Sequence, residues 1–479
     1  MRRLLNDLRV YLAETAAALV RGWDRFFFTP ADPTAPGLIR VAVGLLSLWS
    51  LGVAGLDLRA FFGSDGWIDP ATLREFLDER TPWAWSFWLW VPDRLLGPAW
   101  VACLVVLALF TLGLGSRVTA VLTWGILVST SRRAPLTLFG FDQILSTWAL
   151  YLAATGAGGQ AVSLDRFLGR WRRARAELAR RRREGRRLDG VIVPGAPEPT
   201  VSANLALRLV QLHLALIYGT AGLSKLQGPS WWNGTAIERL LGNSEFRPVD
   251  LTWLAAFPLL LNLMTHLSLA LEIGYPVLIW NRRLRPLVMA GAVAMHVGIG
   301  LMMGLYEFSA AMIVGNLAFV PGAWLRSLVT GRVQPAGRVL YDGACPRCRA
   351  SVALLGAADP DRVIEPIDLT AVDVATIHPA LTKEACLRAM HLVRADGRVD
   401  SGYDAVLTLT RWLPLAWPAA ALGHLPGVAW LGRRVYNHLA ATRPRDVPCT
   451  DEACSLPPRP AAAPPEGTRA AAESRRAPR

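Results

Sequence analysis

Two cysteines in the string Cys345-Pro-Arg-Cys348 have the spacing of a dithiol that can close into a disulfide. Residues i and i+3 at the start of a helix face the same side, and a helix N-terminus favours a thiolate at the first of them. Pro346 suits the first helical position, where its missing N–H has no partner in any case. The apolar stretch 337–341 predicts a strand just before this turn, a context typical of thioredoxin-like redox domains. We expect Cys345 to attack a disulfide and Cys348 to resolve the mixed disulfide.

Two other interpretations of this cysteine pair stay open. Cys449 and Cys454 can join it in a four-cysteine zinc site, although their spacing of five and their distance of about 100 residues along the chain suit zinc less well. The pair can also be purely structural. Either of the late cysteines is a candidate for a second redox relay, whereas Cys103 and Cys386 are expected to be buried without chemistry. We favour the redox interpretation and predict no metal site.

A second set of candidates lies in or beside apolar stretches, where ionisable side chains are costly and often functional. These candidates are Asp142, His213, Lys225, His266, Glu272 and His296. Lys225 is conspicuous because the chain has only one other lysine, Lys383. A partly buried, dehydrated lysine can accept a proton at neutral pH. The alternative for each residue is a polar side chain that simply holds the helices together.

Membrane-spanning helices are the elements expected to position these residues. The chain is 52% hydrophobic and 18% charged and contains 19 Trp, whereas soluble chains are about 25% charged. A span needs about 20 mostly apolar residues. We expect eight spans, with seven or nine as alternatives, at 36–56, 98–115, 118–131, 136–155, 203–222, within 255–280, at 286–305 and at 309–325. The predicted fold is an α-helical polytopic membrane bundle followed by a small α/β thioredoxin-like domain.

The charged loops predict the orientation of the bundle. Residues 165–189 hold eleven Arg and four acidic residues, whereas residues 57–94 hold seven acidic residues and four Arg. Because basic loops stay inside, both termini are expected in the cytoplasm of a bacterium, with the chain in its inner membrane. The pair Arg132/Arg133 falls outside and disagrees. We interpret the net charge of +14 as this topology signal, and expect the lipid bilayer as a partner and nucleic acid not to be one.

The predicted domains follow from these patterns. Residues 1–35 are expected to form an amphipathic helix on the membrane surface, with Trp23, Phe26, Phe27 and Phe28 as interface anchors. The transmembrane domain covers 36–326 and the α/β domain 337–456. In the latter, 363–367 predicts a second strand and 390–399 a hairpin with a type I′ turn at Asp396-Gly397. The Pro/Ala/Arg-rich tail 457–479 is expected to be disordered.

The segment from Gln211 to Ala236 resembles the HTTM family, the transmembrane domain shared with vitamin K-dependent γ-carboxylase. The resemblance covers roughly residues 20–326. It rests on Val162-Ser-Leu-Asp165, Ala221-Gly222, Lys225-Leu226, Trp231 or Trp232 with Gly234, Glu272 ahead of Pro276, Arg282/Arg283 and His296. It implies that Lys225 is the base that deprotonates reduced vitamin K. Oxygen then turns the quinol anion into a strong base that removes a proton from a glutamate side chain, and the carbanion takes up carbon dioxide.

This resemblance also predicts a pocket for a quinone between the helices. The residues expected in it are His213, Trp231, Trp232, Glu272 and His296, with Glu272 and His296 as a candidate polar pair. No tightly bound cofactor is expected, and a reduced naphthoquinone (vitamin K or menaquinol) is the expected co-substrate. The predicted outward loops are short and hold no large luminal region for a protein substrate, so a quinone-linked or small-substrate reaction is equally compatible.

The residues from Tyr341 to Cys348 resemble the DCC family of predicted thiol-disulfide oxidoreductases, which is named for an Asp and two Cys. Here these are Asp342, Cys345 and Cys348. The resemblance extends over about 338–456 and includes Gly402-Tyr-Asp404-Ala405, Arg411-Trp-Leu-Pro414 and Tyr436 to Arg443. It implies a dithiol enzyme acting on a protein thiol or disulfide. The alternatives are a non-catalytic scaffold or maturation factor with a thiol-handling module, and a transporter.

Overall fold

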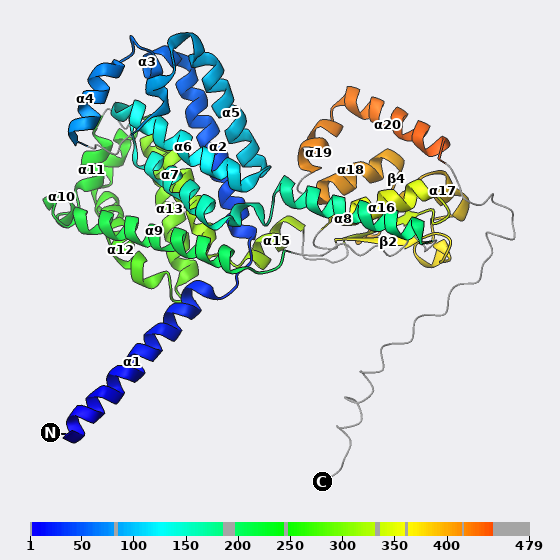
Figure 1. Cartoon of the computed structure of the whole chain (residues 1–479), viewed down its shortest axis with the longest axis horizontal. Coiled ribbons are helices and arrows are strands. Elements are labelled where there is room, and N and C mark those ends of the chain that lie inside the picture. The colour runs from blue at the N-terminus through cyan, green and yellow to red at the C-terminus, as the bar shows by residue number, and fades with distance from the viewer. Residues whose placement is uncertain are drawn as a thin grey trace. The chain divides into compact units, whose positions relative to one another are not determined.

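The computed structural model describes residues 2–80, 85–184, 197–243, 248–330, 336–359, 363–413 and 416–443. The chain divides into two compact units (Figure 1). The first unit contains Met1–Gly169 and Ala196–Val329, and the second contains Arg170–Gly195 and Thr330–Arg479. Most of the basic helix α8 (Leu164–Arg183) therefore belongs to the second unit. Within that unit Ala174 packs on Ala357, and Arg170 donates a hydrogen bond to the carbonyl of Gly356 (2.9 Å).

The first unit is built from helices around an apolar core. Its helices are α1 (Arg2–Phe28), α2 (Thr34–Ala54), α3 (Leu58–Phe62), α4 (Pro70–Arg80), α5 (Leu96–Leu112), α6 (Ser116–Arg133), α7 (Gly140–Thr155), the start of α8, α9 (Val201–Lys225), α10 (Pro229–Trp232), α11 (Ala236–Leu241), α12 (Pro258–Leu278), α13 (Arg285–Met303), α14 (Tyr306–Gly315) and α15 (Gly322–Thr330). Trp148, Tyr218 and Tyr275 are among the largest side chains buried in the core.

Within the residues that the structure describes, four helical stretches are long and apolar enough to cross a membrane: Thr34–Phe62, Asp93–Leu112, Val201–Lys225 and Arg285–Met303. A fifth results if Tyr306–Phe319 and Gly322–Leu328, which meet at a bend of 117°, count as one span. The predicted count of eight is not confirmed. Helices α6, α7 and α12 occupy the third, fourth and sixth predicted spans. However, α6 ends in two arginines, α7 has only 16 residues, and α12 carries a histidine and a glutamate.

Helix α1 is exposed over most of its length, and Trp23 and Phe28 are 61% and 50% exposed. Phe26 behaves differently from the expected interface anchor. Its ring contacts that of Trp280, with 5.6 Å between centroids, and the guanidinium of Arg208 lies 4.2 Å from its centroid. Phe26 therefore joins the end of α1 to the helical bundle.

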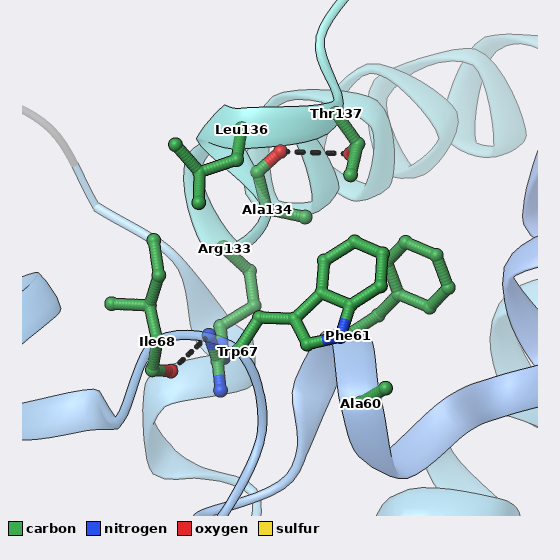
Figure 2. A pocket seen from close by; sticks show the side chains of 8 residues that line it. All are labelled: Ala60, Phe61, Trp67, Ile68, Arg133, Ala134, Leu136 and Thr137. Carbon is green, nitrogen blue, oxygen red and sulfur yellow. Dashed lines mark hydrogen bonds between the residues drawn. The ribbon is translucent and has the colours of Figure 1, made fainter.

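Arg133, one of the two arginines that disagreed with the charge rule, has a structural role. Its buried side chain donates hydrogen bonds to the carbonyls of Gly63 (2.7 Å) and Ile68 (3.0 Å). It also lines a recess of about 10 Å³ together with Phe61 and Trp67 (Figure 2). That volume holds about one water molecule, so the recess is too small for a substrate. Arg133 fixes the loop before α4.

The string Val162-Ser-Leu-Asp165 also organises the fold. The Asp165 carboxylate accepts hydrogen bonds from the N–H groups of Gly115 (2.8 Å) and Ser116 (2.7 Å), and so stabilises the start of α6. The buried Arg40 donates to the carbonyl of Val162 (2.6 Å). Val162 is the only non-glycine residue with positive φ (50°) in the described ranges. These contacts indicate that residues 162–165 stabilise the fold of the first unit.

The second unit contains the predicted small α/β fold. Its mixed sheet has the order β2-β1-β3-β4, with β1 (Gly337–Tyr341) parallel to β2 (Ile364–Asp368) and antiparallel to β3 (His391–Arg394), which pairs antiparallel with β4 (Val399–Ser401). Its further helices are α16 (Pro346–Ala358), α17 (Lys383–Arg388), α18 (Gly402–Trp412), α19 (Trp417–Gly423) and α20 (Pro426–Ala441). Helix α16 is the crossover between the parallel strands, so its first turn lies at the carboxyl end of β1.

The predicted hairpin forms, but the prediction of a type I′ turn is wrong. Only Gly397 (φ 80°) has a positive φ in the loop, whereas a type I′ turn requires it at Asp396 as well. The carbonyl of Arg394 accepts a hydrogen bond from the N–H of Gly397 (3.0 Å), and the N–H of Arg394 donates to the carbonyl of Arg398 (2.8 Å). The loop therefore has three residues, with the glycine in the left-handed region.

Candidate functional site

Lys225, the last residue of α9, forms an ion pair with Glu272 of α12. Its Nζ lies 2.7 Å from Oε1 and 2.5 Å from Oε2 of the carboxylate. The two side chains are 25% and 8% exposed. A buried charge is costly unless an opposite charge lies beside it, and this contact supplies that opposite charge to both side chains. The structure thus brings together two residues that the sequence singled out separately.

Small residues in α9 allow this contact between the two helices. A Cβ added at Gly222 would lie 3.0 Å from the backbone nitrogen of Ile273, and one added at Gly219 would lie 3.1 Å from Cγ of Pro276. The backbone of α9 therefore approaches α12 one turn before Lys225. Gly222 of the Ala221-Gly222 string therefore permits the close approach of the two helices.

We expect Gly222→Ala to lower the thermal unfolding temperature of the full chain in detergent micelles. The added methyl group overpacks the contact between α9 and α12, which costs about 1–3 kcal/mol. The matched control is Gly298→Ala in α13, where nothing lies within 4 Å of the added Cβ. That variant should be neutral or more stable, because Ala is favoured over Gly in helices by up to about 1 kcal/mol. Equal shifts for both variants would contradict the close packing.

An apolar cavity of about 810 Å³ adjoins the ion pair. Lys225, Trp231 and Glu272 line it, and the Trp231 ring centroid lies 5.1 Å from Nζ of Lys225. Most of its other lining is aliphatic and thioether side chains from α11, α12 and α13, including Leu241, Met264, Leu271, Met295, Ile299 and Met302. Small-molecule sites are about 300–1,000 Å³, mostly apolar and with few polar groups. The cavity has this character.

Three of the residues predicted for the pocket do not line this cavity. Trp232 is 64% exposed and donates its indole N–H to the carbonyl of Leu226 (2.7 Å). His213 packs edge-on against Tyr151, with 5.9 Å between centroids. His296 is the third and lies in a different polar contact.

The expected pair of Glu272 with His296 does not form. His296 is buried, and its Nε2 lies 3.0 Å from the hydroxyl of Tyr218. Tyr218 stacks on Tyr275, with 3.9 Å between centroids, and the Tyr275 hydroxyl donates to Asn316 (2.8 Å). Sequence analysis missed Tyr218, Tyr275 and Asn316, although polar groups in apolar helices are a signal that identifies such residues.

The other two ionisable candidates have local roles in the fold. Asp142 accepts the N–H of Phe139 (2.9 Å) at the start of α7. His266 lies with Nδ1 3.0 Å from the carbonyl of Asn262 and Nε2 3.3 Å from that of Trp232. Asp142 therefore stabilises the start of α7, and His266 connects α12 to the carbonyl at the end of α10.

The dithiol lies at the first turn of α16. Cys345 caps the helix, and its Sγ accepts the N–H of Cys348 at 3.2 Å. The buried Asp342 accepts the N–H of Ala344 on its carboxylate (3.1 Å) and that of Cys345 on its carbonyl (3.1 Å). Gly343 lies so close to Asp368 that an added Cβ would be 2.1 Å from its carboxylate. Both cysteines are free thiols.

The two thiols have different surroundings. Cys345 has no exposed surface, whereas Cys348 is partly exposed. Burial, followed by the effect of Cys345, raises the pKa of the Cys348 thiol to about 12. The arrangement favours a neutral thiol at Cys348.

We expect the alkylation of Cys348 by iodoacetamide to rise with pH much later than that of an ordinary thiol. Only the thiolate reacts, and the raised pKa of Cys348 keeps the residue protonated at pH 9. A thiol placed by Arg398→Cys, at a side chain that is 77% exposed, is the control. Mass spectrometry of the separate peptides gives both rates. Parallel pH profiles would contradict the raised pKa.

Of the other four cysteines, the structure describes Cys103 and Cys386. Cys103 and Cys386 are buried, and burial raises the pKa of Cys386. Cys449 and Cys454, proposed as zinc ligands or a second relay, lie outside the described residues. Within the described ranges, no group of three or more His, Cys, Asp or Glu residues can hold a metal ion.

Comparison with protein families gives two matches in the predicted order. The HTTM domain model matches residues 184–324, which include Lys225 and Glu272. The DCC1-like thiol-disulfide oxidoreductase model matches residues 339–446, which include Cys345 and Cys348. No curated protein and no solved structure matches the chain. Residues 184–324 thus match an HTTM domain, and the following residues 339–446 match a DCC1-like thiol-disulfide oxidoreductase domain, as the sequence predicted.

Proposed function

We propose that the second unit catalyses thiol–disulfide exchange with a protein partner, with Cys345 as nucleophile and Cys348 as resolving thiol. The observation that carries the proposal is the hydrogen bond from the Cys348 N–H to Sγ of Cys345 at the start of α16. A helix N-terminus stabilises negative charge on that sulfur. The match to the oxidoreductase family supports the same reaction class.

The exchange starts from the reduced forms of Cys345 and Cys348. The Cys345 thiolate attacks one sulfur of the partner's disulfide and displaces the other as a thiolate. Cys348 then loses its proton, attacks Sγ of Cys345 and releases the second partner thiolate. Two electrons reach the partner, and the two cysteines become a disulfide. Asp342, which is buried in the turn before Cys345, is the proposed proton acceptor.

A redox titration tests this proposal. We would equilibrate the full chain in lipid nanodiscs with glutathione buffers of increasing oxidation and digest it after trapping free thiols. The peptide that holds Cys345 and Cys348 should lose two hydrogens as one disulfide forms. The variant Cys386→Ser, which removes a buried cysteine of the same unit, should titrate like wild type. A folded chain whose dithiol stays reduced in every buffer would refute the proposal.

We further infer that the first unit binds a quinol in the apolar cavity, with Lys225 as the base. The supporting observation is an ion pair that lines a cavity of about 810 Å³ with otherwise mostly apolar walls. In the ion pair Lys225 is an ammonium, so it first passes a proton to the hydrogen-bonded carboxylate of Glu272, and the neutral amine then takes the proton of the quinol hydroxyl. A positive Lys225 would stabilise the quinolate oxygen beside it. The basic segment 165–189 supports our further proposal that the second unit lies on the cytosolic side of a bacterial inner membrane.

The test uses membranes that contain the full chain, supplied with a reduced naphthoquinone and oxygen. Wild type should form the epoxide, and Lys225→Ala should not. Lys383→Ala, which removes the other lysine of the chain, is the matched control and should behave like wild type. Absence of the epoxide in all three would refute quinol chemistry. The first unit would then be a scaffold for the thiol module.

A further inference from the structure

Helices α19 and α20 expose a row of apolar side chains on the second unit. The row consists of Trp417, Leu422, Leu425, Val428, Trp430, Leu431, Val435 and Leu439, which are between 42% and 62% exposed. We call these residues the α19–α20 face. In α20, Val428, Leu431, Val435 and Leu439 follow one another at steps of three or four residues. They therefore lie on one side of the helix.

Contacts beside this row hold α20 on its own unit. The hydroxyl of Tyr436 accepts the N–H of Met390 at 2.9 Å. A Cβ at Gly432 would lie 2.3 Å from the ring of Tyr403, which shows how closely α20 meets α18 (Figure 1). The aliphatic row is therefore an exposed flank of α20 that adjoins the contact with α18.

The charges around this face suit an anionic surface. Residues 416–443 contain no Asp or Glu and three arginines, Arg433, Arg434 and Arg443. Arg433 pairs with Asp404 (2.9 Å), whereas the guanidinium of Arg434 lies 5.5 Å from the ring centroid of Trp430. Tryptophans beside arginines on an amphipathic helix are typical of binding at the headgroup level of a bilayer.

We propose that the α19–α20 face docks on the anionic lipid surface of the membrane that holds the first unit. The aliphatic side chains of α20 enter the boundary between headgroups and acyl chains, and Arg434 binds lipid phosphates. Covalent connection to an HTTM domain with membrane-spanning helices keeps this face at high effective concentration near lipid. The occupant is lipid and not another protein, because an exposed aliphatic row is accompanied by the arginine Arg434, and residues 416–443 carry no acidic side chain.

Hydrogen–deuterium exchange on the full chain tests the docking. Peptides from 417–443 should exchange more slowly in nanodiscs of phosphatidylglycerol and phosphatidylcholine than in nanodiscs of phosphatidylcholine alone. The double variant Leu431→Glu/Val435→Glu should lose this difference. Both side chains are at least half exposed, so the fold should persist, which unchanged exchange in β1 and β3 would verify. Arg398→Glu on the hairpin changes charge away from the face and should retain the difference.

Two results would overturn the proposal. Slow exchange of 417–443 in both lipids, unaffected by the double variant, would mean that another part of the chain covers the face. Fast exchange in both lipids would mean that the face remains in water. Protection that depends on the anionic lipid and on Leu431 and Val435 is the supporting result.

Discussion

Cys348→Ser is expected to trap the second unit as a stable mixed disulfide, whereas Cys345→Ser is expected to abolish thiol–disulfide exchange. Burial raises the pKa of the Cys348 thiol, so this residue stays protonated at pH 7 and attacks slowly. Cys345 is the proposed attacking sulfur, because it receives an N–H hydrogen bond at a helix N-terminus. Loss of Cys345 therefore removes the attacking group, and loss of Cys348 removes the release step.

The measurement is the intact mass of the full chain after incubation with oxidised glutathione. Cys348→Ser should gain one glutathione on Cys345, and Cys345→Ser should remain unmodified. Cys386→Ser, in the same unit and also buried, controls for the substitution itself. A glutathione adduct on Cys348 in the Cys345→Ser variant would reverse the two roles.

The burial of Cys345 has a consequence for its partners. A protein disulfide cannot reach a sulfur with no exposed surface, so attack requires the loop from Asp342 to Cys348 to open locally. Arg349 closes this loop by donating to the carbonyl of Gly343. Access, more than thiolate fraction, should then separate small disulfides from protein disulfides as substrates.

Local patterns in the sequence predicted the dithiol region well. The strand at 337–341 forms with the predicted bounds, and the Pro346 helix starts where capping requires it. The hairpin at 390–399 also forms, with β3 paired antiparallel to β4. Its turn type was predicted wrongly, since Asp396-Gly397 suits both a two-residue turn and a three-residue loop. Register decides between them, and register is set by pairing across the sheet.

The contacts between helices of the first unit were much harder to predict. The sequence identified Lys225 and Glu272, which are 47 residues apart, but not that they meet. Their pairing depends on how α9 packs on α12, and the local signs of that packing are the glycines at 219 and 222. His296 was predicted to face Glu272 and instead contacts Tyr218. Helix periodicity identifies a buried side of a helix but not the partner that covers it.

Lys225→Ala is expected to destabilise the first unit by about 3–5 kcal/mol, the typical result of removing one partner from a buried ion pair. The variant leaves the Glu272 carboxylate, only 8% exposed, without its cation. Glu272→Gln should cost less than loss of Lys225, because the amide is uncharged and fills the same space. The free energy of unfolding of the full chain in detergent micelles, measured by denaturant titration, checks both values.

The double variant Lys225→Met/Glu272→Leu separates stability from chemistry. Removing both charges together leaves no unpaired ion, so this variant should be more stable than Lys225→Ala. As a control, Asp396→Ala breaks an exposed pair with Arg398, which should change stability by about 0–1 kcal/mol. Strictly additive effects at Lys225 and Glu272 would show that the two charges are not coupled. If the double variant is stable but forms no quinone epoxide, the pair is needed for the chemistry itself, because loss of folding no longer explains the inactivity.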